Sequence, residues 1–372
     1  LTVVASAVAP TVETPPAGVT ATAGRGARFS VAANSTVTLA YQWEYSADGG
    51  ASWGAASEGP EFIGTETSTL TVRTAPLAMH GYQFRCVISD GANPAVTSAV
   101  AALSVKWSQF AALSARAPAG TGEQTLILGF VFAGGGKPTL VRGVGPGIST
   151  VSGYMMDPQL RVYTSGSVEV ASNDDWPGSQ ELMDAFVQTG AGALDPASKD
   201  AALLQNLTGN VYTAHVSGAN GTTGVALAEA YDADFSDKTK RLTALSVRNQ
   251  VGVDDAILIA GFVIAGDAPK QVIVRGVGPG ISTVNGYLRD PQLQVWKLNT
   301  VTGKWTLSGE NDDWDHTLAT AALFKAASMG ELGNDSKDAA LVLTLDPGIY
   351  TAQVSGVGRT TGVGLAEIYE MP

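Results

Sequence analysis

An internal duplication constrains the fold of this chain more than any other feature. Residues 141–151 read VRGVGPGISTV, and residues 274–284 repeat the same letters. The correspondence continues toward the end of the chain, because DPQL, NDDW, SKDAAL and TTGV each occur in both copies in the same order. The repeat is about 130 residues long, far longer than the unit of a solenoid. Each copy is therefore expected to be a domain of its own.

The duplication divides the chain into consecutive segments. We assign residues 9–105 to a first domain, 106–236 to the first copy and 237–372 to the second copy. At the start of residues 1–8, the apolar Leu1 and Val3 alternate with Thr2 as in a strand. This pattern predicts an orphan strand or a linker. A strand donated to a neighbouring molecule would join chains end to end, so other copies of the chain and surface proteins are expected partners through strand pairing.

Composition and periodicity both favour an all-β fold. The chain contains 44 glycines and 17 prolines, which favours short strands and tight turns over long helices. Apolar runs at 125–132 and 256–264 are typical of strands in the core of a sandwich. One short helix per copy is predicted, at 180–189 and 316–329. We therefore predict three β-sandwich domains in series, of which the second and third are homologous and jelly-roll-like.

The segment 9–105 has a pattern of its own. It presents, in order, Tyr41-Gln-Trp43, Thr69-Leu-Thr-Val72 and Gly81-Tyr-Gln-Phe-Arg-Cys86. In these residues it resembles the bacterial immunoglobulin-like domains of large secreted and surface proteins. The resemblance implies that Trp43 lies in the core on strand C and that Cys86 lies on strand F. Cys86 is the single cysteine, so it forms no intrachain disulfide and should be buried and unreactive.

Acidic loops recur at matching places in the two copies. Each copy has an aspartate before a strand, an Asn-Asp-Asp triplet after a hairpin and an aspartate after the helix. These candidate metal ligands are Asp157, Asn173, Asp174, Asp175 and Asp200 in the first copy, and Asp290, Asn311, Asp312, Asp313 and Asp338 in the second. Calcium prefers about six to eight oxygen ligands of this kind. The alternative is that the triplet only forms an Asx-turn.

A second resemblance supports calcium as the metal. The stretch from DPQL through NDDW to YTAHVSG, at 157–218, resembles the pre-peptidase C-terminal type of β-sandwich in large secreted bacterial proteins. The resemblance covers the later part of each copy. It implies an extracellular or cell-surface location and calcium at the acidic loops.

Several function classes are disfavoured. His215 corresponds to Gln353 in the other copy, so a duplicated active site would lose its base. The loop at 143–147 lacks the spacing of a phosphate-binding loop, and Pro146 removes a backbone donor. A formal net charge of −12 repels a nucleic-acid backbone. No apolar run reaches the roughly 18 residues of a membrane span.

We therefore expect a non-enzymatic structural or adhesive module of an extracellular or cell-surface protein, such as a filament subunit, with calcium-stabilised repeats. The alternative is a non-catalytic carbohydrate-binding region of a secreted enzyme, because Trp296 and Trp305 on a lengthened hairpin could stack on a polysaccharide.

Two further predictions concern the interior of each copy. Trp176 and Trp314 are expected to close the end of each sandwich. A buried ion pair is expected between Arg142 and Glu229, and between their counterparts Arg275 and Glu367, because buried charges need partners.

Overall fold

The computed structural model describes residues 8–371. The predicted strand or linker at residues 1–8 therefore lies, apart from Val8, outside the described residues. The chain divides into two compact units. The first is Leu1–Trp107 with Gly266–Ala268, and the second is Ser108–Ala265 with Pro269–Pro372. Both units are built from strands, and the described residues include two short α-helices, so the prediction of an all-β fold is confirmed.

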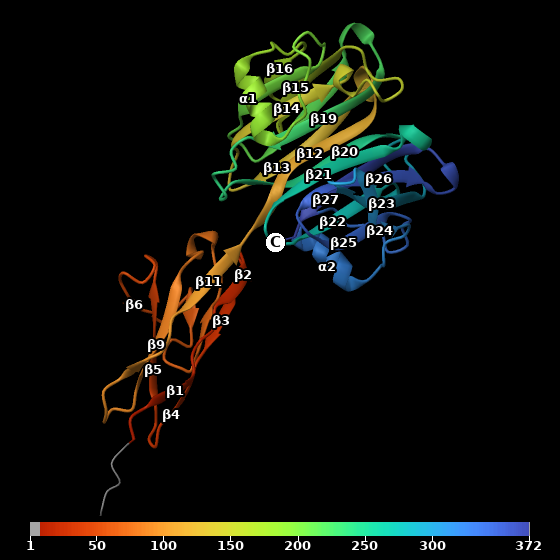
Figure 1. Ribbon diagram of the computed structural model, residues 1–372. Helices are drawn as coiled ribbons and strands as arrows, with labels where there is room; N and C mark the ends of the chain where they lie inside the picture. Colours follow the sequence, from red (N-terminus) through yellow and green to blue (C-terminus); the bar gives the residue numbers. More distant parts are fainter. Residues whose placement is uncertain (1–7, 372) are drawn as a thin grey trace, which may run out of the picture. The chain divides into compact units, whose positions relative to one another are not determined.

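The first unit is an immunoglobulin-like sandwich. One sheet has the order β2 (Val19–Thr22), β11 (Ala101–Lys106), β9 (Gln83–Ser89), β5 (Ala40–Ser46) and β6 (Gly54–Ala55), with β10 (Val96–Thr97) beside β9. The second sheet joins β3 (Ala27–Ser30), β8 (Thr69–Val72) and β7 (Phe62–Ile63), and a short ladder pairs β1 (Thr11–Thr14) with β4 (Ala32–Asn34). Figure 1 shows these strands in red and orange.

Alternating burial explains why these segments form strands. In β9, Phe84, Cys86 and Ile88 point into the core while the residues between them are partly exposed. Trp43 on β5 lies directly opposite Cys86, and both side chains are fully buried. The indole Nε1 of Trp43 donates a hydrogen bond to the carbonyl of Thr67 at 2.8 Å. The predicted core positions of Trp43 and Cys86 are thus confirmed.

We expect Cys86 to be unreactive in the native protein. Burial raises the pKa of its thiol to about 12, so the nucleophilic thiolate is scarce at neutral pH. A thiol reagent should leave the native chain unlabelled and should modify Cys86 after denaturation, which serves as the positive control. Rapid labelling of the native chain would contradict this prediction.

In the second unit, each copy supplies the same succession of elements. The first copy contains β12 (Ser108–Ala119), β13 (Leu126–Ala133), β14 (Pro138–Val144), β15 (Pro158–Thr164), β16 (Glu169–Asn173), α1 (Gln180–Thr189), β17 (Ala201–Asn206), β18 (Val211–Gly218) and β19 (Gly224–Asp232). The second contains β20 (Arg241–Val251), β21 (Leu258–Gly266), β22 (Lys270–Val277), β23 (Pro291–Asn299), β24 (Lys304–Asn311), α2 (Leu318–Ala326), β25 (Ala339–Leu345), β26 (Gly348–Gly356) and β27 (Gly362–Glu370).

Short 3₁₀ turns occupy several of the connections. They are η1 (Leu77–Met79) in the first unit, and η2 (Gly122–Gln124), η3 (Pro146–Ile148), η4 (Ala219–Gly221), η5 (Asp254–Ala256), η6 (Pro279–Ile281) and η7 (Val357–Arg359) in the second.

The two helices differ in how well their ends could be predicted. α1 spans the predicted residues, because the Ser179 side chain caps its first turn and Gly190 ends it with φ of 72°. α2 is shorter than the predicted 316–329. Thr317 accepts the N–H of Thr320 and so caps the helix, while His316 has φ of 52° and lies outside it. Trp176 and Trp314 are 3% exposed, but they pack against these helices in clusters separate from the sandwich core, and so do not close the ends of the sandwiches as predicted.

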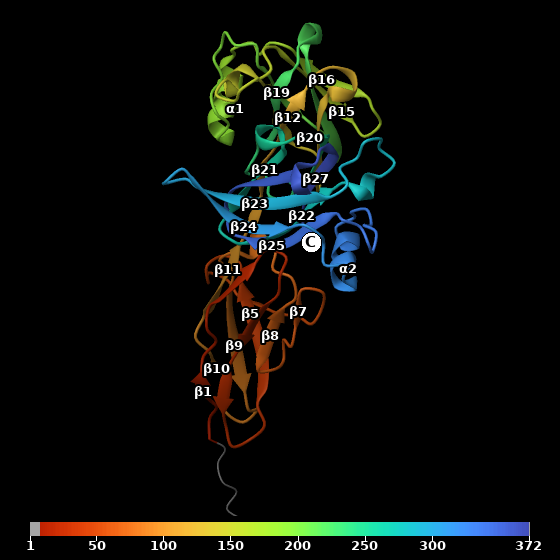
Figure 2. The ribbon, with the colours of Figure 1, turned by 90° about the vertical axis from the view of Figure 1, so that its right-hand side faces the viewer.

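Each copy builds two facing antiparallel sheets. In the first copy they have the orders β16-β15-β18-β13 and β17-β14-β19-β12, and in the second β24-β23-β26-β21 and β25-β22-β27-β20. The first strand of each copy also borders the other copy. β20 pairs with β13 on one edge and with β27 on the other, and β12 lies between β19 and β21. Figure 1 and Figure 2 show these strands together at the centre of the unit.

These cross-copy pairings of the first strands join the copies into a single compact unit. The sequence led us to expect separate domains at 106–236 and 237–372, whereas the structure extends each sheet of one copy into a sheet of the other. One hydrophobic core contains residues of both copies. At its centre, Phe110 packs edge-to-face on Phe262, with ring centroids 5.9 Å apart. The physical reason is that β12 and β20 have strand partners on both of their edges.

Candidate functional site

The glycine-rich loop of each copy closes on a carboxylate of the chain itself. Asp200 is fully buried, and its Oδ1 accepts hydrogen bonds from the N–H groups of Gly145 at 2.7 Å and Gly147 at 3.1 Å. A Cβ at position 145 would lie 2.0 Å from the carbonyl oxygen of Met155, so the turn requires glycine. Asp338 repeats the arrangement with Gly278 and Gly280. The two backbone N–H groups of each loop are thus hydrogen-bonded to an aspartate of the same chain.

Asn173 and Asp175 also have partners within the first copy. Asn173 accepts the N–H of Ala202 at 2.9 Å and donates to the carbonyl of Asp175 at 3.1 Å. The carboxylate of Asp175 forms an ion pair with Lys199 at 2.5 Å. The second copy repeats these contacts with Asn311, Asp313, Lys337 and Ala340. These residues tie the end of the hairpin to the next strand.

Asp157 and Asp174 form the acidic pair of the first copy. Loss of hydration, followed by the charges of Asp157 and Asp175, raises the pKa of Asp174. Oδ1 of Asp157 is buried and has no hydrogen-bond partner. Asp290 and Asp312 reproduce both features in the second copy. Each loop therefore contains two interacting carboxylates, one of which has an unsatisfied buried oxygen.

The fold does not bring all five predicted metal ligands of a copy together. In each copy the structure brings two of the five predicted residues together as an acidic pair and bonds the other three to the chain. Among residues 8–371, no group of three or more His, Cys, Asp or Glu side chains is arranged to hold a metal ion. Calcium at these loops stays a prediction.

The tryptophans of the lengthened hairpin lie on one face of it. Trp296 on β23 is opposite Leu307, and Leu298 is opposite Trp305 on β24. Since side chains two residues apart share a face, Trp296 and Trp305 point to the same side. Trp305 is 44% exposed, whereas Trp296 is only partly exposed. The hairpin projects from the unit at the left of Figure 2.

The predicted Arg–Glu pairs are present in both copies. Arg142 lies 2.5 Å from Glu229, and Arg275 lies 2.5 Å from Glu367. Arg142 also donates to the carbonyl of Gly192, just after α1, and stacks on the ring of Phe186 in that helix. Each pair therefore fastens a helix and its following loop to the sheet.

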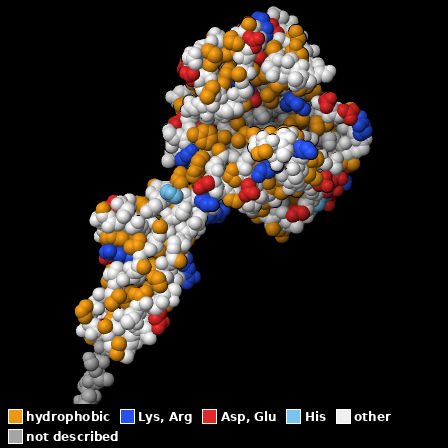
Figure 3. Space-filling view, viewed as in Figure 1, with side chains coloured by type: hydrophobic (Ala, Val, Ile, Leu, Met, Phe, Trp, Pro, Cys, Tyr) orange, Lys and Arg blue, Asp and Glu red, His pale blue; other side chains and the backbone are white. Residues whose placement is uncertain are grey.

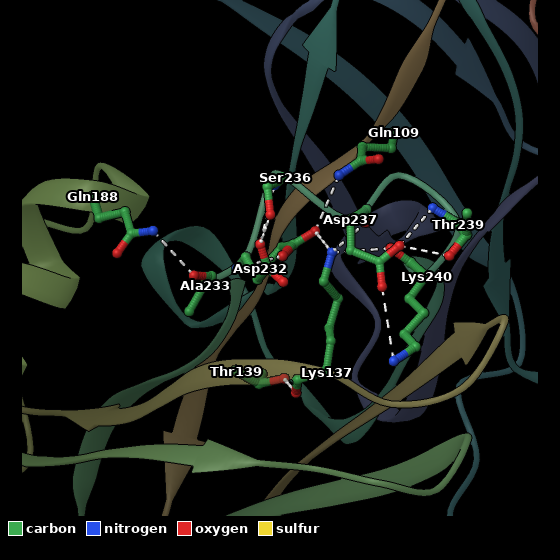
Figure 4. Close-up of polar contacts among 11 residues, drawn as sticks. Gln109, Lys137, Thr139, Gln188, Asp232, Ala233, Ser236, Asp237, Thr239 and Lys240 are labelled. Carbon is green, nitrogen blue, oxygen red and sulfur yellow. Dashed lines mark hydrogen bonds and ion pairs between the residues drawn. The ribbon is translucent and has the colours of Figure 1, made fainter. Parts of the chain in front are cut away.

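Sequence reasoning missed a second buried ion pair. Figure 4 shows Lys137 and Gln109 both directed at Asp232. The Lys137 Nζ lies 2.8 Å from Oδ2 of Asp232, and the two side chains are 1% and 0% exposed. The same ammonium donates to the carbonyls of Asp237 and Lys240 in the segment that leads to β20. The pair thus anchors the connection between the copies.

An alignment of the two copies could have predicted this ion pair. Lys137 corresponds to Lys270, and Asp232 corresponds to Glu370. Lys270 lies 2.8 Å from Glu370, which has a second cation, Arg241, at 2.6 Å. Opposite charges at corresponding positions of two apolar strands could therefore have been recognised as a pair.

Charged side chains are dispersed on the face of the protein that Figure 3 shows. Acidic and basic groups alternate there without a large patch of one sign. Among the described residues, no helix is long and apolar enough to cross a membrane.

No family model matches the chain, and no curated protein matches it at a significant level. Among solved structures, titin domain M4 is 20% identical, covering 26% of this chain and 95% of that chain with a TM-score of 0.22. The twitchin kinase region of C. elegans is 13% identical, covering 26% of this chain and 16% of that chain with a TM-score of 0.22. A Dscam structure concerning isoform specificity is 16% identical, covering 28% of this chain and 27% of that chain with a TM-score of 0.25. At these scores the similarities say nothing about function.

Proposed function

We propose that this chain is a non-enzymatic structural or adhesive module of an extracellular or cell-surface protein. In this proposal its two repeats act as one stiff element. The observation that supports it is the continuity of the sheets across the copies, in which β20 is bonded to β13 of the first copy on one edge and to β27 of the second on the other. A force that separates the copies must break such ladders over many residues at once. Independent domains on a linker would offer no such resistance.

The environments of the histidines support a role without catalysis. Nδ1 of His80 accepts the N–H of Val105 at 3.1 Å. His215 hydrogen-bonds to the hydroxyl of Thr213 at 3.0 Å, and burial lowers its pKa. His316 stacks on Trp314 with ring centroids 4.7 Å apart. Each of these rings is engaged in local structure.

Stabilisation of the repeats by calcium belongs to the same proposal. In each acidic pair one member, Asp157 or Asp290, has an unsatisfied carboxylate oxygen, and loss of hydration raises the pKa of the other member, Asp174 or Asp312. A bound cation would relieve the repulsion within each pair. The resemblance of the repeats to secreted bacterial sandwiches supports an extracellular setting, where calcium is plentiful. Other copies of the chain or surface proteins are the proposed partners.

Pulling a single chain from its ends tests the proposed stiff element. The second unit should unfold in one event, with one contour-length step that releases both copies, because their sheets are continuous. The first unit should give its own separate and smaller step, which serves as the internal reference. Two successive steps of one repeat each would contradict the proposal.

Thermal unfolding in calcium and in chelator tests the cation sites. Calcium should raise the melting temperature of the second unit, since a ligand of the folded state stabilises it. In the presence of chelator at neutral pH, the double variant Asp174→Asn, Asp312→Asn should melt at a higher temperature than the unmodified chain. The folded-state pKa of these carboxyls is raised, so their ionised form is penalised above that pKa and the penalty disappears on acidification. Identical melting of the unmodified chain in calcium and chelator would refute calcium binding.

A further inference from the structure

The two long sheets of the second unit end in strands that have one free edge each. One sheet runs from β24 through β21 and β12 to β17, and the other runs from β16 through β13 and β20 to β25. Each of these four end strands pairs with a single neighbour. A free edge presents unpaired N–H and C=O groups, to which a further strand can add. Natural proteins protect such edges with charged side chains, bulges or poor strand formers.

Two of the end strands are protected by bulges and charges. A bulge in β16 leaves Val170 without an opposite residue, and a bulge in β24 does the same for Ser308. Each strand also contains a charged side chain, Glu169 in β16 and Glu310 in β24. These features disfavour the addition of another strand at either edge.

The other two end strands, β17 and β25, correspond to each other in the two copies. β17 ends in Gln205 and Asn206, and asparagine is depleted in strands. At the same positions β25 has Leu343 and Thr344. The seven residues of β25 read AALVLTL and include no charge, no proline and no bulge. Of the four end strands, β25 therefore has the least protection against strand addition.

The backbone of β25 has groups available for a further strand. The N–H of Ala340 bonds to the side chain of Asn311 at 2.8 Å, so it points away from β22. Because every second residue of a strand directs its N–H and C=O to the same edge, Val342 and Thr344 point the same way. Within residues 8–371, the N–H groups of Val342 and Thr344 have no backbone acceptor. These two residues therefore offer a row of donors and acceptors.

The side chains of β25 favour an apolar strand as the neighbour. Leu341 and Leu343 pack against the shared core, and Val342 packs against the cluster that contains Phe324 of α2. All three side chains of β25 are nevertheless only partly buried, and Thr344 is exposed. A strand added at this edge would cover them, and the burial of apolar surface would stabilise the complex.

We propose that β25 pairs with β25 of a second molecule of this chain, antiparallel and centred on Leu343. In this register Val342 lies opposite Thr344 of the other molecule, and each such pair can exchange backbone hydrogen bonds in both directions. The strand is complementary to itself, because no charges meet and two β-branched residues form the cross-strand pair. The second unit already uses this mode of association, since β13 and β20 join the two copies edge to edge. The inference rests on the proposed function for its choice of partner, another molecule of the chain.

Sedimentation of the full chain over a range of concentrations tests this pairing. The unmodified chain should form reversible dimers. Thr344→Lys should weaken the Kd of the dimer by at least about tenfold, because two lysines would then be diagonal neighbours in the interface. The melting temperature should stay unchanged, since Thr344 is exposed. Asn206→Lys is the matched control, because it places a lysine at the corresponding exposed position of β17, and it should leave Kd unchanged.

A charge swap identifies the partner. Thr344→Lys and Thr344→Glu should each sediment as monomers at a concentration at which the unmodified chain is dimeric. Mixing the two variants should restore the dimer, because opposite charges then occupy the diagonal positions. A strand that comes from any other segment or protein would not produce this rescue.

Several results would overturn the proposal. These are a chain that stays monomeric at all concentrations, a dimer that Thr344→Lys does not weaken, and a mixture of the charged variants that stays monomeric. Assemblies larger than a dimer that disappear when residues 1–7 are deleted would show that the edge accepts this segment of a neighbouring molecule instead. None of these results would alter the single unfolding step expected of the stiff element, so the two proposals can fail separately.

Discussion

Replacing Lys137 by methionine is expected to lower the free energy of unfolding of the second unit by about 3–5 kcal/mol, the usual cost of leaving a buried charge unpaired. Lys137 is the ammonium that lies 2.8 Å from Asp232, and both side chains are buried. Without it, Asp232 keeps the amide of Gln109 and the N–H of Asp234 as hydrogen-bond donors, and Lys238 as a cation that interacts with it over a longer range. Denaturant unfolding at neutral pH measures the loss.

The second copy provides a matched control for this variant. Lys270→Met removes the corresponding ammonium, but Glu370 keeps Arg241 at 2.6 Å. We therefore expect a distinctly smaller loss from Lys270→Met. Substituting both members of the first pair, Lys137→Met with Asp232→Leu, should recover much of the stability, because no unpaired charge remains. Equal losses in the two single variants would contradict this interpretation of the pair.

Replacing Phe110 by alanine is expected to destabilise both copies together, by about 3–5 kcal/mol. Phe110 is fully buried, packs on Phe262 of the other copy and lies opposite Leu242 at the start of β20. The cavity left by its ring would open in the core that the copies share. Two buried tryptophans report on the copies separately, Trp176 in the first and Trp314 in the second.

Fluorine NMR of the chain labelled with fluorotryptophan can follow the two reporters. Their native signals should disappear at one denaturant concentration in the unmodified chain, and at one lower concentration in Phe110→Ala. Trp43 lies in the core of the first unit and should keep its own midpoint in both proteins, which controls for nonspecific effects. Separate midpoints for Trp176 and Trp314 would mean that the copies unfold independently.

Local features of this protein could be predicted from its sequence because their causes are local. Alternation of apolar residues gives β9 its buried face of Phe84, Cys86 and Ile88. Ser179 and Gly190 mark the two ends of α1, since a side-chain cap and a left-handed residue act within one turn. The buried pairing of Arg142 with Glu229 follows from the need of any buried charge for a partner.

The roles of the acidic residues depended on tertiary contacts. Sequence spacing placed Asp157, Asp174 and Asp200 in one candidate set, because their side chains are chemically alike. In the fold, Asp200 bonds the backbone of the glycine-rich loop, whereas loss of hydration and the charge of Asp157 raise the pKa of Asp174. The hydrogen-bond partner of each carboxylate oxygen comes from a segment far away in the chain, so a local sequence pattern cannot predict it.

The duplication in the sequence by itself determined that the chain contains two copies of one sandwich. The tertiary structure alone decided that the sheets of one copy continue into those of the other through β12 and β20. The alternating residues of β20 suit a strand paired with β27 of its own copy, but they do not specify β13 as the partner on the other edge, because backbone hydrogen bonds can form between strands of any sequence. The choice depends on close packing across the new edge, where a Cβ on Gly129 would lie 2.6 Å from the hydroxyl of Ser246. Complementarity of that kind arises only when distant strands are side by side.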